Sequence, residues 1–248
     1  MITAEHPLVK VGLIGAAAWS SAVQHLRADA PPVDDEMTTL QWEAAGLVDA
    51  DGAVDPEWAR AIRVTQDAIV GAEVVSVYQE MAFAATLLRH EQTLVCVTAR
   101  GAIEGRKITA VHPMLEVAMA PSELGWELLR RVLPPLKELR ADPRPTRPGD
   151  IELLTLDGVE IPESMRASQQ SFATHLSDLP TLPTAMADAL DPEASVFVYL
   201  LNAEGAHVRQ SSQAWALGRL GLYRVDSDTA AIAKVPAGDL AHRILVEL

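Results

Sequence analysis

Residues 73–111 read EVVSVYQEMAFAATLLRHEQTLVCVTARGAIEGRKITAV, and this stretch sets the expected fold. Residue types that suit a half-buried pleated surface dominate it, and short turns interrupt it. Four strands are predicted, at 73–81, 83–90, 92–100 and 106–111. Strands joined this tightly must be antiparallel, because a parallel return needs a crossover of about a dozen residues or more. The stretch therefore predicts a four-stranded antiparallel meander.

The same pattern returns in the C-terminal half of the chain. Strands are predicted there at 195–202, 206–214, 216–225 and 229–235. A helix is predicted to follow each meander, one starting at Pro121 and the other at Pro236, because proline suits the first turn of a helix. Helix, meander and helix thus occur twice. The sequence predicts an α/β (α+β) fold with a pseudo-twofold duplication, which rests on element order and not on residue identity.

We interpret residues 1–248 as a single domain. Its halves, 1–140 and 151–248, are joined by the proline-rich connector 141–150. Ahead of the first meander, a helix is predicted with Asp55 as N-cap and Pro56 as its first residue. The other predicted elements are strands at 8–14 and 151–156 and helices at 16–27, 38–46, 163–176 and 182–190.

Charge and composition exclude several classes of partner. The chain has 20 Lys and Arg against 34 Asp and Glu, a formal net charge of -14. Nucleic acid and anionic membranes bind best to a positively charged surface, so neither is an expected partner. The single cysteine, Cys96, allows no intrachain disulfide, and no signal peptide or long apolar span is apparent. We therefore expect a cytoplasmic protein.

Motifs for cofactors or catalysis are weak. Gly12 and Gly15 join a strand to a helix, but Ala17 and Ser20 stand where a dinucleotide-binding turn needs further glycines. The seven histidines are scattered singly, and Cys96 lies mid-strand, where a buried thiol is inert. We expect no metal, no cofactor and no enzymatic activity. An enzyme with a dispersed site, such as a nucleotide-binding oxidoreductase, stays open.

The strongest candidate for a binding surface is the predicted strand around residues 215–223. Strand alternation would place four residues on one face: Trp215, Leu217, Arg219 and Tyr223. Trp, Arg and Tyr dominate the hot spots of protein interfaces. The competing interpretations are that this face is covered by the chain's own helices, or that it forms a homodimer interface.

Two stretches and the element order resemble the EspG family of type VII (ESX) secretion-associated proteins. The first runs from Gly46 to Pro56 and leads into an Ala/Arg-rich helix. The second runs from Gly221-Leu222-Tyr223-Arg224 through a strand to Pro236-Ala237-Gly238 and the last helix. The opening at 9–26, a strand that passes into a Trp-containing helix, also fits. Residues 231–234 read AIAK, where the family's final strand would carry a tryptophan.

The resemblance implies a pseudo-twofold α/β fold built round antiparallel sheets. It also implies a cytosolic chaperone that covers the apolar tip of a helical secretion substrate, keeps it soluble and delivers it for export without bond chemistry or a cofactor. The expected partner is a PE/PPE-like or a WXG100-like protein, and both stay open. A homodimerising scaffold is the further alternative.

Overall fold

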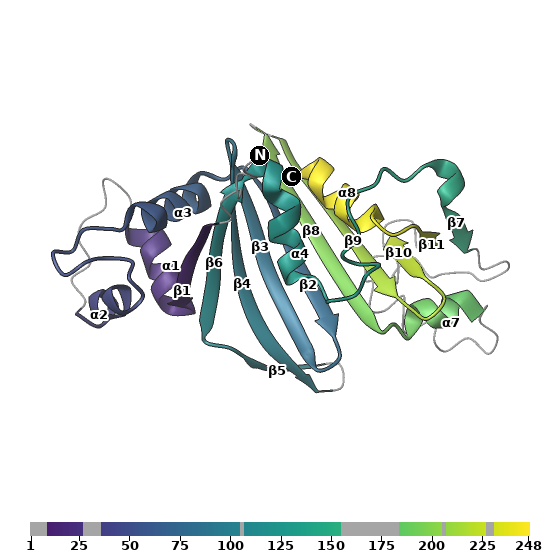
Figure 1. Cartoon of the computed structure of the whole chain (residues 1–248), viewed down its shortest axis with the longest axis horizontal. Helices are drawn as coiled ribbons and strands as arrows, with labels where there is room; N and C mark the ends of the chain where they lie inside the picture. Colours follow the sequence, from purple (N-terminus) through teal and green to yellow (C-terminus); the bar gives the residue numbers. More distant parts are fainter. Residues whose placement is uncertain (1–8, 27–35, 105–106, 155–183, 205–206, 227–230) are drawn as a thin grey trace, which may run out of the picture.

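The computed structural model describes residues 9–26, 36–104, 107–154, 184–204, 207–226 and 231–248. Its centre is one 11-stranded sheet in which all paired neighbours are antiparallel (Figure 1). The strands are β1 (Val9–Gly15), β2 (Val70–Tyr78), β3 (Met81–His90), β4 (Thr93–Glu104), β5 (Lys107–Val111), β6 (Met114–Pro121), β7 (Glu152–Leu154), β8 (Ala194–Glu204), β9 (His207–Leu217), β10 (Leu222–Asp226) and β11 (Ala231–Val235).

The helices pack on both faces of this sheet. They are α1 (Ala16–His25), α2 (Glu36–Ala44), α3 (Pro56–Asp67), α4 (Gly125–Val132), α7 (Thr184–Leu190) and α8 (Asp239–Glu247), with 3-10 turns η1 (Ser122–Leu124) and η2 (Pro148–Asp150). The predicted α+β class is confirmed. The predicted helix 163–176 lies outside the described residues.

The two halves meet at the pairing of β2 with β8. The strand order is β1-β6-β4-β3-β2 on one side and β8-β9-β10-β11-β7 on the other. Each side thus has a meander ending in a strand that precedes a helix, with a further strand at the sheet's edge. The pseudo-twofold duplication itself stays a prediction, which superposition of the two halves would test.

The fourth strand of the first meander differs from the prediction. The predicted strand 106–111 corresponds to β5, which pairs only with the end of β4, at Gly101–Glu104. The fourth place beside β4 belongs to β6, which was not predicted. Residues 117–120 of β6 are all buried, because helices cover both faces of the sheet here. A strand buried on both faces lacks the alternation that marks a half-exposed one.

A helix follows each meander near Pro121 and near Pro236, as predicted, but each α-helix begins a few residues after its proline. Pro121 ends β6, and α4 begins at Gly125 after one 3-10 turn. Pro236 lies in a turn, and α8 begins at Asp239. Gly238 precedes α8 with φ 93°, and a Cβ there would come within 2.5 Å of the Asp142 carbonyl oxygen. Only glycine fits this junction, so the helix starts after it.

The N-terminal elements agree closely with the prediction. Asp55 caps α3 by accepting hydrogen bonds from the backbone N–H groups of Glu57 and Trp58, and Pro56 is the first helical residue. β1 pairs antiparallel with β6, so the strand that carries Gly12 belongs to no parallel sheet. The turn into α1 therefore lacks the sheet context of a dinucleotide-binding fold.

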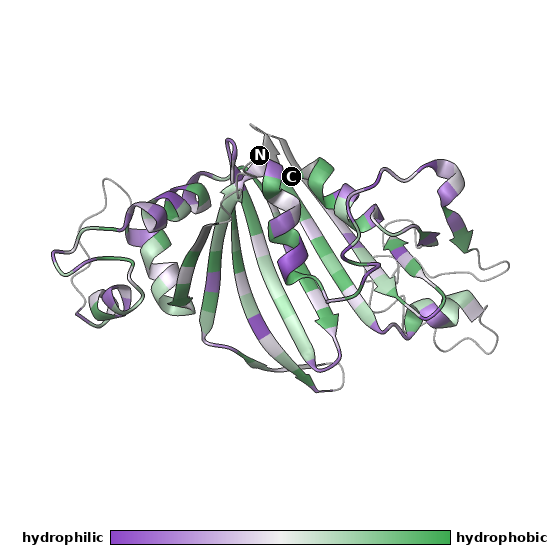
Figure 2. Cartoon of the chain, viewed as in Figure 1, coloured by the Kyte–Doolittle hydropathy of each residue, from purple (hydrophilic) through white to green (hydrophobic). Residues whose placement is uncertain are grey.

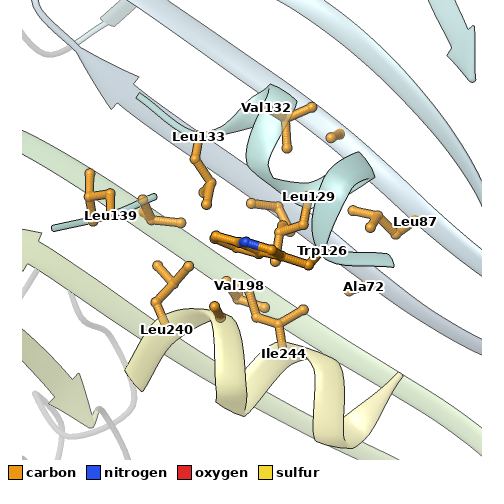
Figure 3. Close-up of a cluster of buried hydrophobic side chains, with 14 of the residues drawn as sticks. Ala72, Leu87, Trp126, Leu129, Val132, Leu133, Leu139, Val198, Leu240 and Ile244 are labelled. Carbon is orange, nitrogen blue, oxygen red and sulfur yellow. The ribbon is translucent and has the colours of Figure 1, made fainter. Parts of the chain in front are cut away.

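One sheet face carries the main core. Helices α4 and α8 lie over it, and Figure 3 shows the ring of Trp126 between them, close to Leu129, Leu240 and Ile244. The connector 141–150 is packed against this layer, since Asp142 accepts a hydrogen bond from the Trp126 indole and the Arg144 N–H donates to the Gly238 carbonyl.

The opposite face is covered only towards its two ends. At the β1–β6 end, α1 and α3 enclose a second core that includes Trp19, Trp42 and Trp58. At the other end, α7 packs on Ala216, Tyr223 and Ile232. Figure 1 shows α1 and α3 at one side of the molecule and α7 at the other. α3 reaches as far as β3. Among the elements that the structure describes, no helix of this face belongs to a core with β2 or β8.

Candidate functional site

The predicted strand 216–225 is interrupted by a turn. β9 ends at Leu217 and β10 begins at Leu222, and the Gly218 N–H donates to the Gly221 carbonyl across the residues between them. Because the chain reverses here, alternation along a single strand does not apply. The predicted placement of Trp215, Leu217, Arg219 and Tyr223 on one face is therefore wrong.

The four residues lie in three different environments. Trp215 and Leu217 are buried in the core beneath α8, whereas Tyr223 is buried on the opposite face beneath α7. Arg219 is exposed in the turn. The exposed fraction is 1% for Trp215 and 0% for Tyr223, so neither side chain is available to a partner in this structure. The interpretation that the chain's own helices cover these aromatics fits them, while the predicted partner-binding role of the set is untested.

Trp215 belongs to a buried polar cluster centred on Asp239. The indole N–H donates to Asp239 at 2.9 Å, Arg224 donates to both carboxylate oxygens, and the Thr146 hydroxyl donates at 2.6 Å. Asp239 is fully buried, and the side chain of Arg224 is 14% exposed. These groups bind one another and hold the connector, β9, β10 and α8 together.

Tyr223 takes part in a second polar cluster, centred on Asp188 of α7. Partial burial acts to raise the pKa of Asp188, but the backbone N–H groups of Leu220 and Arg219 donate to its carboxylate, as does the Tyr223 hydroxyl. The net pKa is lowered. Burial and the hydrogen bond to Asp188 raise the pKa of Tyr223 to about 12.

We predict that Tyr223 makes stability fall in alkaline solution. Below pH 10 the hydroxyl is protonated in both states, and its contribution is complete; between pH 10 and about 12 the unfolded chain ionises first, and stability is lost. Tyr223→Phe should remove up to about 3 kcal/mol of this pH dependence. Urea unfolding at several pH values measures it. If the stability of the unaltered chain and that of Tyr223→Phe fell in parallel with pH, Tyr223 would not be the cause of the alkaline loss.

The uncovered middle of the sheet is the more accessible candidate surface. We define the open sheet face as Glu73 and Val75 of β2, Ala84, Thr86 and Leu88 of β3, and Phe197, Tyr199 and Leu201 of β8. The register places Phe197 beside Val75, and Tyr199 beside Glu73. Phe197, Tyr199 and Leu201 are 42%, 37% and 39% exposed. Three large apolar or aromatic side chains in a row are thus open to solvent on a sheet surface.

A hollow of about 460 Å³ adjoins this face. Trp19 of α1 and Thr65 of α3 border it on one side, and the sheet residues Glu73, Val75 and Leu88 form part of its floor. Figure 2 shows hydrophobic residues along β2, β3 and β8. A shallow apolar trough therefore lies between the helices of the N-terminal half and the middle of the sheet.

Sequence patterns alone did not identify this surface. Residues 196–201 of β8 read VFVYLL, so both faces of the strand are apolar. Val196, Val198 and Leu200 are buried against the main core, which leaves the alternate residues exposed. An apolar residue on the uncovered face cannot be recognised without knowing which helices pack where. The aromatic content of the run was the one available signal.

Groups that could support chemistry are few in the described residues. Cys96 is buried, which raises the pKa of its thiol to about 11 and keeps it neutral, as expected for an inert cysteine. Gly12 packs against Trp58, since a Cβ there would lie 2.6 Å from the indole ring. Within the described ranges no group of three or more His, Cys, Asp or Glu residues could hold a metal ion. The expectation of no metal and no cofactor stays a prediction.

A second, smaller hollow of about 70 Å³ lies beside α4. Arg100 and Arg131 border it, and both pair with Glu116, which is placed between them. The carboxylate already neutralises much of the positive charge that an anion would need.

No helix in the described part of the chain is long and apolar enough to span a membrane.

Comparison with known proteins gives one informative result. No protein-family model matches the sequence, and no curated protein matches it. A solved structure matches it: the Mycobacterium tuberculosis type VII secretion system chaperone EspG5 in complex with the PE25-PPE41 dimer. The TM-score is 0.53 at 14% sequence identity, over 95% of this chain and 93% of the other. The resemblance to the EspG family is thus confirmed in the fold, and this chain has a fold like that of a type VII secretion chaperone.

Proposed function

We propose that the protein is a cytoplasmic, non-enzymatic chaperone that binds the apolar tip of a helical type VII secretion substrate on its open sheet face. The observation that carries the proposal is the exposed row of Phe197, Tyr199 and Leu201 in the middle of a sheet whose ends are covered. The likeness to EspG5, solved with the PE25-PPE41 dimer, supports a PE/PPE-like partner over a WXG100-like one.

The dimensions of the open sheet face suit a helical partner. Four strand spacings separate β4 from β9, which is about 19 Å at about 4.8 Å per spacing. A helix with its side chains is about 10 Å across, so one helix fits between the covered ends. The exposed aromatic side chains supply large contact area with few rotatable bonds, as interface anchors do.

Co-purification tests the proposal. The chain would be co-expressed with the PE25-PPE41 dimer, and with PE/PPE-like and WXG100-like pairs from its own genome, and the complexes analysed by size exclusion with light scattering. We expect a complex with one such pair. If no pair binds and the mass of the chain alone rises with concentration, the homodimerising scaffold is correct. If a dinucleotide at micromolar concentration raises the melting temperature of the chain, the alternative of a nucleotide-binding enzyme is correct.

Phe197→Ala should separate binding from folding. Because the ring is 42% exposed, its removal should lower the free energy of unfolding by less than about 1 kcal/mol, while costing about 2 kcal/mol or more of partner affinity. Calorimetric titration and urea unfolding measure the two quantities. Leu153→Ala is the matched control, since Leu153 is an exposed apolar residue of the edge strand β7. Equal affinity of both variants would place the partner elsewhere.

A further inference from the structure

Glu73 is the charged group on the otherwise neutral open sheet face. It lies in β2 between Thr86 of β3 and Tyr199 of β8, and its side chain is exposed. It also borders the hollow beneath α1 and α3. Within the described residues, the salt bridges formed by the acids Glu91, Glu116, Glu127 and Asp239 do not involve Glu73. Its carboxylate thus faces solvent without a cation from this part of the chain.

Among the described residues that surround Glu73 on this face, none is basic. The neighbours on this face are Val75, Ala84, Leu88, Phe197 and Leu201, together with Thr86 and Tyr199. Trp19 and Thr65, which border the hollow, are also uncharged. A partner that covered this surface with apolar groups alone would remove the water that hydrates the carboxylate. It would offer neither a hydrogen bond nor a positive charge to replace that hydration. Burial of an unpaired charge is strongly unfavourable, so such a partner would be rejected.

We propose that Glu73 selects partners whose apolar tip carries a lysine or arginine beside its apolar residues. The inference rests on the proposed function and specifies the chemistry of the occupant. The apolar row of β8 would bind the apolar side of the tip, and the carboxylate would bind its cation in a partly desolvated site. A charge at such a place contributes more to the choice of partner than to affinity alone.

The charge of the chain disfavours a second copy as the occupant. Each copy has a formal net charge of -14, so two copies repel at low salt. In a twofold contact centred on β2, Glu73 would also approach the Glu73 of its partner copy. Like charges brought together on a desolvated surface are destabilising. A basic tip from a different protein avoids both costs.

Charge variants test the inference. The probe is the helical pair that forms a complex with the unaltered chain in the co-purification above. Glu73→Gln should weaken binding about tenfold or more, and Glu73→Lys about a hundredfold or more. Glu43→Gln, an exposed acid on α2, is the control and should bind within about twofold of the unaltered chain. The affinity of the unaltered chain should fall more steeply with salt than that of Glu73→Gln.

A charge swap identifies the cation. Lysines and arginines at the partner's tip would be changed to glutamate one at a time, and one of these changes should restore binding to Glu73→Lys. If the complex forms but Glu73→Gln binds within about twofold, Glu73 has no selective role and the proposed function stands. If Glu73→Gln weakens binding but no charge swap restores binding to Glu73→Lys, the proposed pairing of Glu73 with a lysine or arginine of the partner is wrong. If no pair binds at all, the inference falls together with the function.

Discussion

Trp215→Ala is expected to lower the free energy of unfolding by about 3–5 kcal/mol. The side chain is almost fully buried among the apolar residues of the main core, where Leu217 and Leu222 also lie. Its removal would leave a cavity and forfeit the transfer free energy of the ring. It would also remove one hydrogen bond to the buried carboxylate of Asp239. Chemical denaturation monitored by far-UV circular dichroism measures the change.

Two further variants distinguish packing from binding at Trp215. Leu220→Ala removes an exposed apolar side chain from the neighbouring turn and should change stability by less than about 0.5 kcal/mol. Trp215→Phe keeps most of the packing and should cost less than the alanine variant. If Trp215→Ala kept full stability and lost only partner affinity, the ring would be an interface residue, as the residue types around 215–223 suggested.

Asp239→Asn is expected to destabilise the fold by about 3–5 kcal/mol. The substitution keeps the shape of the side chain but removes the negative charge that faces Arg224, whose Nη1 lies 2.8 Å from the carboxylate. The guanidinium of Arg224 is largely removed from water. Without its counter-ion, no interaction would compensate for this loss of hydration. The asparagine amide would also face the indole and guanidinium donors with donors of its own.

The double variant Asp239→Asn with Arg224→Met tests this explanation. Arg224→Met removes the guanidinium charge that Asp239→Asn leaves without a counter-ion, and it supplies an apolar side chain of similar length. It should therefore recover part of the lost stability. Asp191→Asn, at an exposed position, should have little effect. Additive losses in the double variant would mean that the two residues act independently, which contradicts a coupled ion pair.

The described residues bring together few groups that could support catalysis. Its two polar clusters are buried or partly buried, and their groups bind one another. What the described surface presents instead is a stretch of sheet with aromatic and apolar side chains and one carboxylate. At 14% identity, the likeness to EspG5 concerns the fold alone, so the partner has to be found by experiment.

Much of the secondary structure could be predicted from the sequence. The strands near 73–100 and 195–214 alternate or are β-branched and are joined by short turns, which requires antiparallel pairing. The Asp55-Pro56 start of α3 is local chemistry, because the cap and the helix are neighbours in sequence. Such features depend on contacts within a few residues, and for that reason composition and spacing suffice to predict them.

The tertiary structure decided which residues are available to a partner. β6 lies between layers on both sides, and the turn at 218–221 separates Trp215 from Tyr223, which puts them on opposite faces. The exposed face of β8 is open because α8 covers its other face while α1, α3 and α7 pack elsewhere. Burial of an apolar side chain depends on elements far away in sequence. A strand that is apolar on both faces carries no local mark of the face that stays open.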